Sequence, residues 1–129
     1  RPYIYVVNSD QAFLEMIGDL LADVRAQVSL EQLRPNIEVT VANLRMAKPD
    51  VLLLDVVPFH SDARLLLERL EGDPVLHDLP VILASTSPGV AEQLADAHAR
   101  LVREVLPKPF DLDEFYALLG RVVVGLRVP

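Results

Sequence analysis

The hydrophobic positions of this chain form short continuous runs that are separated by longer stretches of helical periodicity. The clearest run, residues 51–54, lies between Pro49 and Pro58 and is followed directly by Asp55. A run so short and so apolar is typical of a strand that is buried on both faces, as in parallel sheets covered by helices. We therefore predict a central strand that ends at Asp55, at the edge where open α/β sheets bind their ligands.

The same pattern predicts further strands at residues 3–7, 81–84 and 104–106, each of them short and largely apolar. Apolar residues recur at helical spacing in four other segments. The expected helical stripes are Phe13, Ile17, Leu20, Leu21 and Val24 in a helix that ends near Arg25; Leu66, Leu67 and Leu70 after a cap at Ser61-Asp62; Val90, Leu94, Ala97 and Leu101 after Ser87-Pro88; and Leu112, Phe115, Leu119 and Val122 after a capping box of Asp111 and Glu114.

Residues 26–48 fit two interpretations. Apolar residues alternate over residues 37–42 as in a strand, but the same segment also carries a helical stripe behind a good N-cap, Asn36. A strand there would leave too few residues for a crossover to the Asp55 strand, because parallel neighbours need about a dozen. We therefore predict a strand at residues 27–31 and a helix at residues 36–47.

This order of elements is a βα unit repeated five times. With right-handed crossovers it predicts an α/β fold of the flavodoxin-like type, a three-layer (βα)5 sandwich around a five-stranded parallel sheet. We expect residues 1–124 to form this domain and residues 125–129 to be a C-terminal tail or the start of a linker.

Composition narrows the class of protein. A length of 129 residues indicates one domain, and the absence of cysteine removes disulfides and thiolate metal sites. The net charge of −7 argues against direct binding to nucleic acid or to an anionic membrane surface. The absence of cysteine is compatible with a reducing compartment, so we expect a cytoplasmic protein. No apolar run approaches the ~20 residues of a membrane span. The three histidines, His60, His77 and His98, lack metal-ligand spacing and are expected to face solvent.

Side chains with useful chemistry follow four of the predicted strands. Residues 8–10 follow the first, Asp55 ends the central one, residues 85–87 follow the next, and Lys108 follows the last. The carboxyl ends of parallel strands share one edge of the sheet, so a carboxylate, a hydroxyl and an ammonium group should meet there.

The chain resembles the receiver domain of bacterial response regulators, the CheY-like superfamily, over nearly its whole length. The resemblance rests on Val6-Val7 before a polar triplet, on residues 49–55, on residues 80–85 and on Lys108-Pro109-Phe110. It implies that Asp55 is the phosphoacceptor, that Ser85 is the switch hydroxyl and that Lys108 contacts the phosphoryl group. It also implies a cis peptide bond before Pro109.

The resemblance further implies a non-enzymatic role in two-component phosphorelay signal transduction. The expected partner is a sensor histidine kinase or a His-phosphotransfer protein, and the expected cofactor is Mg²⁺. A homodimer is implied through the face made by the helix that starts at Ser87-Pro88, the strand at 104–106 and the last helix. Phosphorylation would switch this surface, beginning at the segment after Ser85.

The chain departs from the family at the metal site. Receivers end their first strand in two adjacent acids, and the matching residues here are Asn8 and Ser9. Because Mg²⁺ is usually held through carboxylates, we predict weakened Mg²⁺ binding. The candidate ligands are Asp55, Asp10, Ser9 and the backbone carbonyl of Val57.

Two other departures are Val105, where receivers carry an aromatic residue, and Pro58, which comes one residue early. The neutral residues Asn8 and Ser9 motivate the alternative function, a phosphorylation-independent pseudo-receiver that acts as a protein interaction module. A haloacid-dehalogenase-like phosphatase is disfavoured, because that family needs a second Asp where this chain has Val57.

Overall fold

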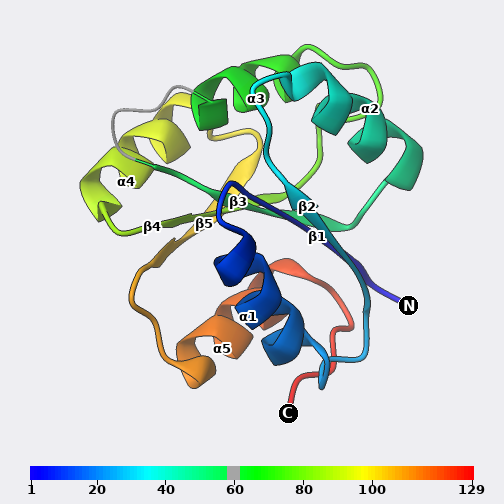
Figure 1. Cartoon of the computed structure of the whole chain (residues 1–129), viewed down its shortest axis with the longest axis vertical. Helices are drawn as coiled ribbons and strands as arrows, with labels where there is room; N and C mark the ends of the chain where they lie inside the picture. Colours follow the sequence, from blue (N-terminus) through cyan, green and yellow to red (C-terminus); the bar gives the residue numbers. More distant parts are fainter. Residues whose placement is uncertain (58–61) are drawn as a thin grey trace.

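A computed structural model of the chain describes residues 1–57 and 62–129, and in it strands and helices alternate from end to end. The elements are β1 (Tyr3–Asn8), α1 (Gln11–Leu21), β2 (Gln27–Gln32), α2 (Ile37–Ala47), β3 (Val51–Asp55), α3 (Asp62–Glu71), β4 (Val81–Ser85), α4 (Pro88–Ala97), β5 (Val102–Pro107) and α5 (Leu112–Val122). Helices α2, α3 and α4 cover one face of the sheet, and α1 and α5 cover the other (Figure 1). The predicted (βα)5 sandwich is confirmed.

The five strands are parallel and lie in the order β2-β1-β3-β4-β5. The chain moves outward from β1 to β2 and then returns to β3 on the other side of β1. This reversal leaves a crevice at the carboxyl ends of β1 and β3, which is where open α/β sheets bind ligands. Asp55 and Asn8 end these two strands.

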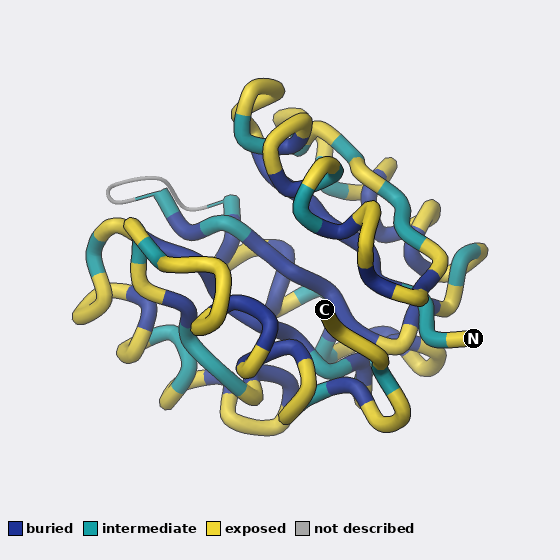
Figure 2. The backbone as a smooth tube through the Cα atoms, turned by 90° about the horizontal axis from the view of Figure 1, so that it is seen from below, coloured by how far each residue is buried: buried dark blue, intermediate teal, exposed yellow. Residues whose placement is uncertain are grey.

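The sheet separates two hydrophobic cores, and its strands are the most buried part of the molecule (Figure 2). Alternate residues of β1 and β3 face opposite sides. Tyr5, Val7, Leu52 and Leu54 belong to the core under α2, α3 and α4, whereas Ile4, Val6, Val51 and Leu53 belong to the core under α1 and α5. The predicted central strand is therefore buried on both faces.

The ambiguous segment folds as the crossover argument predicted. Residues 27–32 form β2, and α2 begins after Asn36, whose side-chain oxygen accepts a hydrogen bond from the Glu38 N–H at 3.2 Å. The predicted cap at Asp111 is also confirmed, since its carboxylate accepts from the Glu114 N–H at 2.7 Å. The predicted cap at Ser61 lies outside the described residues.

Three helical predictions are wrong in detail. Helix α1 ends at Leu21 rather than near Arg25, and Val24 is buried in the turn that follows. In α4 the predicted stripe is half right, because Leu94 packs against the core and Leu101, just after the helix, is buried. Val90 is 39% exposed, however, and the buried residue within the helix is Ala91. Helix α4 lies over the edge strand β5, so it covers less core than a central helix and needs only a small residue at its contact. Leu112, the first residue of α5, is exposed.

His98 also differs from the prediction that the histidines face solvent. It is only 7% exposed, and its Nδ1 lies 2.6 Å from Oε1 of Glu71. His98 caps the end of α4, a boundary position whose burial depends on the neighbouring helix α3 rather than on helical period. His77 is partly exposed beside Asp78, and His60 lies outside the part that the structure describes. Among the described helices, none is both long and apolar enough to cross a membrane.

Candidate functional site

Asp55 ends the central strand in a largely enclosed position, where its side chain is 11% exposed. The ammonium group of Lys108 forms an ion pair and a hydrogen bond with Oδ1 of this carboxylate. The same Nζ lies 3.9 Å from the centre of the Phe13 ring on α1, a cation–π contact. Two contacts from different elements thus hold the lysine against Asp55.

Local backbone contacts bring Lys108 to this edge of the sheet. Its backbone N–H donates to the carbonyl of Ser85 at 2.8 Å, which continues the pairing of β4 with β5. The Lys108–Pro109 peptide bond is cis. The hydrogen bond to Ser85 keeps the segment after β5 beside the end of β4, and the lysine side chain reaches Asp55 at the end of β3.

Ser85 is fully buried at the end of β4, one residue beyond Ala84, which pairs with Asp55. Its hydroxyl oxygen accepts a hydrogen bond from the Ser87 N–H at 2.9 Å, and the hydroxyl donates to the Ser87 carbonyl at 3.2 Å. Ser87 is the N-cap of α4, and its own side chain makes no cap hydrogen bond. The Ser85 hydroxyl is therefore bound to the start of α4.

Asn8 is the third buried polar group at this edge, with 1% of its surface exposed. Its Oδ1 accepts a hydrogen bond from the Asp10 N–H at 2.8 Å, whereas its Nδ2 has no hydrogen-bond partner among the described residues. Val7 pairs with Leu54 in the parallel register of β1 and β3, so Asn8 is next to Asp55. By strand alternation both side chains lie on the α1 and α5 side of the sheet.

Comparisons with known proteins agree on the architecture. No family model and no curated protein sequence matches the chain. The chemotaxis response regulator CheY4 of Vibrio cholerae is 20% identical over 95% of this chain and 98% of that chain, with a TM-score of 0.77. A response regulator receiver protein from Burkholderia phymatum is 26% identical over 95% and 94%, with a TM-score of 0.75. The chain has the receiver fold.

The receiver fold also occurs in a neighbour that is described differently. A putative pilus assembly protein (cpaE) from Burkholderia thailandensis is 24% identical over 95% of this chain and 98% of that chain, with a TM-score of 0.74. The fold is therefore common to solved structures with different descriptions, and a function must be argued from the site.

The residues at this edge of the receiver fold do not fit a tight Mg²⁺ site. In the described ranges there is no group of three or more His, Cys, Asp or Glu side chains that could hold a metal. Asp10 caps α1, accepting from the Ala12 N–H at 2.9 Å, and the unpaired end of Asn8 is an N–H donor, which cannot bind a cation. The oxygen atoms that could still bind a metal ion are therefore only those around Asp55.

A small cavity of about 30 Å³ lies beside Asp55 and is large enough for one water molecule. It is lined by Ser9, Leu33, Asp55, Val57, Asp62 and Ala63. Three predicted metal-site residues therefore meet here, and Asp10 is not among them. The sequence predicts that Asp62 caps and opens α3, but it does not predict the position of Asp62 beside Asp55.

Sequence reasoning also missed Phe13, which was assigned to the hydrophobic stripe of α1. No local pattern marks it, because its contact with Lys108 joins α1 to a segment some 95 positions later in the chain. The predicted meeting of Asp55 and Lys108 is present in the structure, and Ser85 ends the neighbouring strand.

Proposed function

We propose that the chain is a receiver domain of a two-component phosphorelay, formed by residues 1–124, that accepts a phosphoryl group on Asp55. The supporting observation is the ion pair between Lys108 and Asp55 at the carboxyl end of the central strand. A carboxylate with a cation fixed beside it can act as a nucleophile toward phosphorus and then have the new charge neutralised. The donor is a phosphohistidine of a sensor histidine kinase or a His-phosphotransfer protein.

The transfer is a displacement at phosphorus. Lys108 holds Oδ1, and we assign Oδ2 of Asp55 as the attacking oxygen. The new O–P bond forms as the P–N bond to the donor imidazole breaks, and the imidazole leaves with that electron pair and takes up a proton. The product is an acyl phosphate, whose oxygens accept strong hydrogen bonds from the ammonium group of Lys108.

Ser85 connects this event to the surface. An acyl phosphate attracts the Ser85 hydroxyl, which must then leave the N–H and carbonyl of Ser87. The start of α4 thereby loses two hydrogen bonds. The surface formed by α4, β5 and α5 changes as a result, and we propose this face for homodimer formation.

The test is phosphorylation by phosphoramidate followed by intact mass measurement. The wild-type chain should gain one phosphoryl group, and Asp55→Asn should gain none. Asp62→Asn is the matched control, because it neutralises another carboxylate that lines the same cavity. This control should still gain the group. A gain that survives Asp55→Asn, or no gain in the wild type, would contradict the proposal.

A second candidate function is a pseudo-receiver that binds partners without phosphorylation. The presence of Asn8 and Ser9, where receivers carry metal-binding acids, favours it. In that case Asp55 serves only as the structural partner of Lys108. Partner binding would then be unchanged in Asp55→Asn, whereas the first proposal requires that binding change on phosphorylation.

A further inference from the structure

We propose that the carboxyl edge of the sheet at Asp55 binds an oxyanion of the phosphoryl type without a metal ion, with Nδ2 of Asn8 and Nζ of Lys108 as the donors. This inference rests on the proposed function and adds to it the means by which phosphoryl charge is stabilised. The group at the end of β1 is a hydrogen-bond donor, in place of a metal-ligating acid.

The first argument is the unpaired amide of Asn8. The residue is 1% exposed, and Nδ2 has no hydrogen-bond partner among residues 1–57 and 62–129. Buried side-chain donors are nearly always paired in folded proteins, because the loss of water must be compensated. A buried donor left open beside Asp55 is a position that an incoming acceptor can fill.

The second argument is that the orientation of this amide is determined. Its Oδ1 accepts from the backbone N–H of Asp10 at 2.8 Å. Turning the amide over would place its NH₂ group against that N–H, donor against donor. Oδ1 is therefore held by the turn after β1, and the NH₂ group is the end that remains available.

The third argument is the common side of the donors. Asn8 and Asp55 are neighbours in register and lie on the α1 and α5 side of the sheet. The ammonium group of Lys108 contacts both Asp55 and the ring of Phe13 on α1, so it lies on this same side of the sheet. A tetrahedral oxyanion on Asp55 has several charged oxygens, so it can accept from both donors at once.

The decisive variant is Asn8→Asp. It keeps an oxygen to accept from the Asp10 N–H but replaces the NH₂ donor with an anionic oxygen. Asn36→Asp is the matched control: it makes the same chemical change at the N-cap of α2, where Asp and Asn cap equally well. Each protein is treated with phosphoramidate in excess EDTA and again with Mg²⁺, and the mass gain is followed with time.

We expect the wild type and Asn36→Asp to accept the phosphoryl group in EDTA at about the rate seen with Mg²⁺. Asn8→Asp should be slower in EDTA by about tenfold or more, as for a lost charge-assisted donor, and should recover with Mg²⁺. Recovery would also show that the variant is folded. Calorimetric titration of Mg²⁺ should give binding to Asn8→Asp that is about tenfold tighter than to the wild type.

A second measurement does not depend on rates. In nuclear magnetic resonance spectra recorded in EDTA, phosphorylation should shift the side-chain NH₂ signals of Asn8 and leave those of Asn36 in place. Phosphorylation of the wild type only when Mg²⁺ is present, or unshifted Asn8 signals, would overturn this inference and leave the proposed function standing. No phosphorylation under either condition would overturn the proposed function itself.

Discussion

Helices α3 and α4 cover the same face of the sheet but are held to it in different ways (Figure 1). Helix α3 buries Ala63, Leu66, Leu67 and Leu70, whereas the buried residue of α4 is Ala91. Burial of apolar surface is the main stabilising term in folding. Helix α3 is therefore anchored in the core, and α4 contributes little to it.

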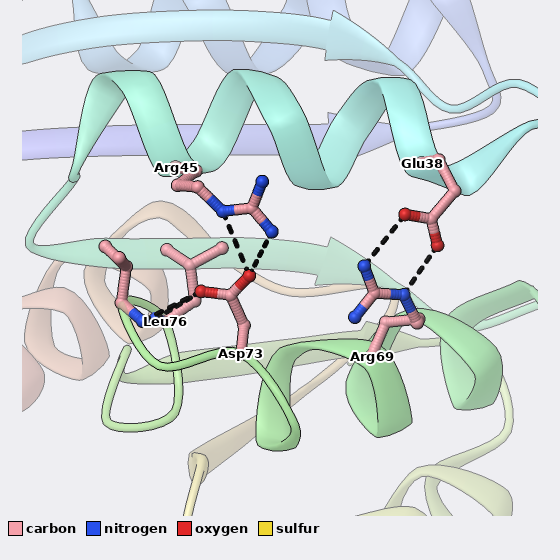
Figure 3. Close-up of polar contacts among 6 residues, drawn as sticks. Glu38, Arg45, Arg69, Asp73 and Leu76 are labelled. Atoms are coloured by element: carbon pink, nitrogen blue, oxygen red, sulfur yellow. Dashed lines mark hydrogen bonds and ion pairs between the residues drawn. The ribbon is translucent and has the colours of Figure 1, made fainter.

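Polar contacts also hold α3 more firmly than α4. Two ion pairs join α2 to the α3 region (Figure 3). Arg69 binds both carboxylate oxygens of Glu38, at 2.5 and 2.8 Å, and Arg45 binds the buried carboxylate of Asp73 just after α3. Helices α2 and α3 thus form a braced pair.

Helix α4 has fewer such contacts in the described part of the chain. At its start Ser87 makes no side-chain cap, and at its end His98 contacts Glu71 of α3. A helix with little buried apolar surface can shift at low cost, because local stability follows buried contacts. The proposed switch begins at Ser85, so it acts on the less firmly held helix and leaves the braced pair in place.

The largest expected effect contrasts core residues of the two helices. Leu67→Ala removes a fully buried side chain of α3 and should lower the free energy of unfolding by about 2–5 kcal/mol. Leu94→Ala removes a partly buried side chain of α4 and should cost about 1 kcal/mol. Urea unfolding measures both. Equal losses would show that α4 is anchored as firmly as α3.

The ion pair between Arg45 and Asp73 should make the free energy of unfolding depend on pH. The Arg45 guanidinium, assisted by two backbone N–H groups, holds the pKa of Asp73 below its ordinary value of 3.8, although burial opposes this. A carboxyl with a lowered folded-state pKa stabilises the fold above its unfolded-state pKa and loses that contribution as pH falls through the folded-state pKa. Asp73→Asn should therefore destabilise the protein most above about pH 5, and its difference from wild type should shrink in acid.

Asp73→Asn isolates the charge, because an amide oxygen can still accept from the N–H groups of Val75 and Leu76. The measurement is urea unfolding across the acidic range. Asp96→Asn on the exposed side of α4 is the control and should leave the pH profile close to that of the wild type. If the difference in free energy of unfolding between Asp73→Asn and the wild type stayed constant with pH, the assigned ion pair would be contradicted.

Much of the architecture could be predicted from residue patterns alone. The apolar run 51–54 placed Asp55 at the end of a central strand, and crossover length decided between strand and helix in residues 26–48. The meeting of Asp55 with Lys108 followed, because parallel strands bring their carboxyl ends to one edge. These conclusions depend on periodicity and topology, which are properties of short segments and their order.

The parts that could not be predicted depend on packing between distant elements. The contact of Lys108 with Phe13 and that of His98 with Glu71 each join separate segments, and local periodicity does not encode them. The unpaired NH₂ group of Asn8 is likewise visible only when all its neighbours are in place. Both the weak anchoring of α4 and the donor at the site became apparent only from the folded chain.

The smallest predicted effect tests the contact between α3 and α4. His98→Ala should lower the free energy of unfolding by about 1 kcal/mol, because it removes a hydrogen bond to Glu71. Hydrogen exchange should become faster in the last turn of α4 and stay unchanged in α2 and α3. His98→Asn should restore much of the protection, because its Nδ2 can occupy the position of the imidazole Nδ1.

The control for this contact is Arg64→Ala, which removes an exposed pair with Glu68 at 3.0 Å within α3. Exposed pairs at this helical spacing contribute about 0.3–0.5 kcal/mol, so this variant should cost less than His98→Ala and should not loosen α4. Faster exchange in α2 and α3 of His98→Ala would mean that α4 and the braced pair unfold together. The conclusion that α4 can move while α2 and α3 stay fixed would then be wrong. The proposed transmission from Ser85 to the surface of α4, β5 and α5 would be wrong as well.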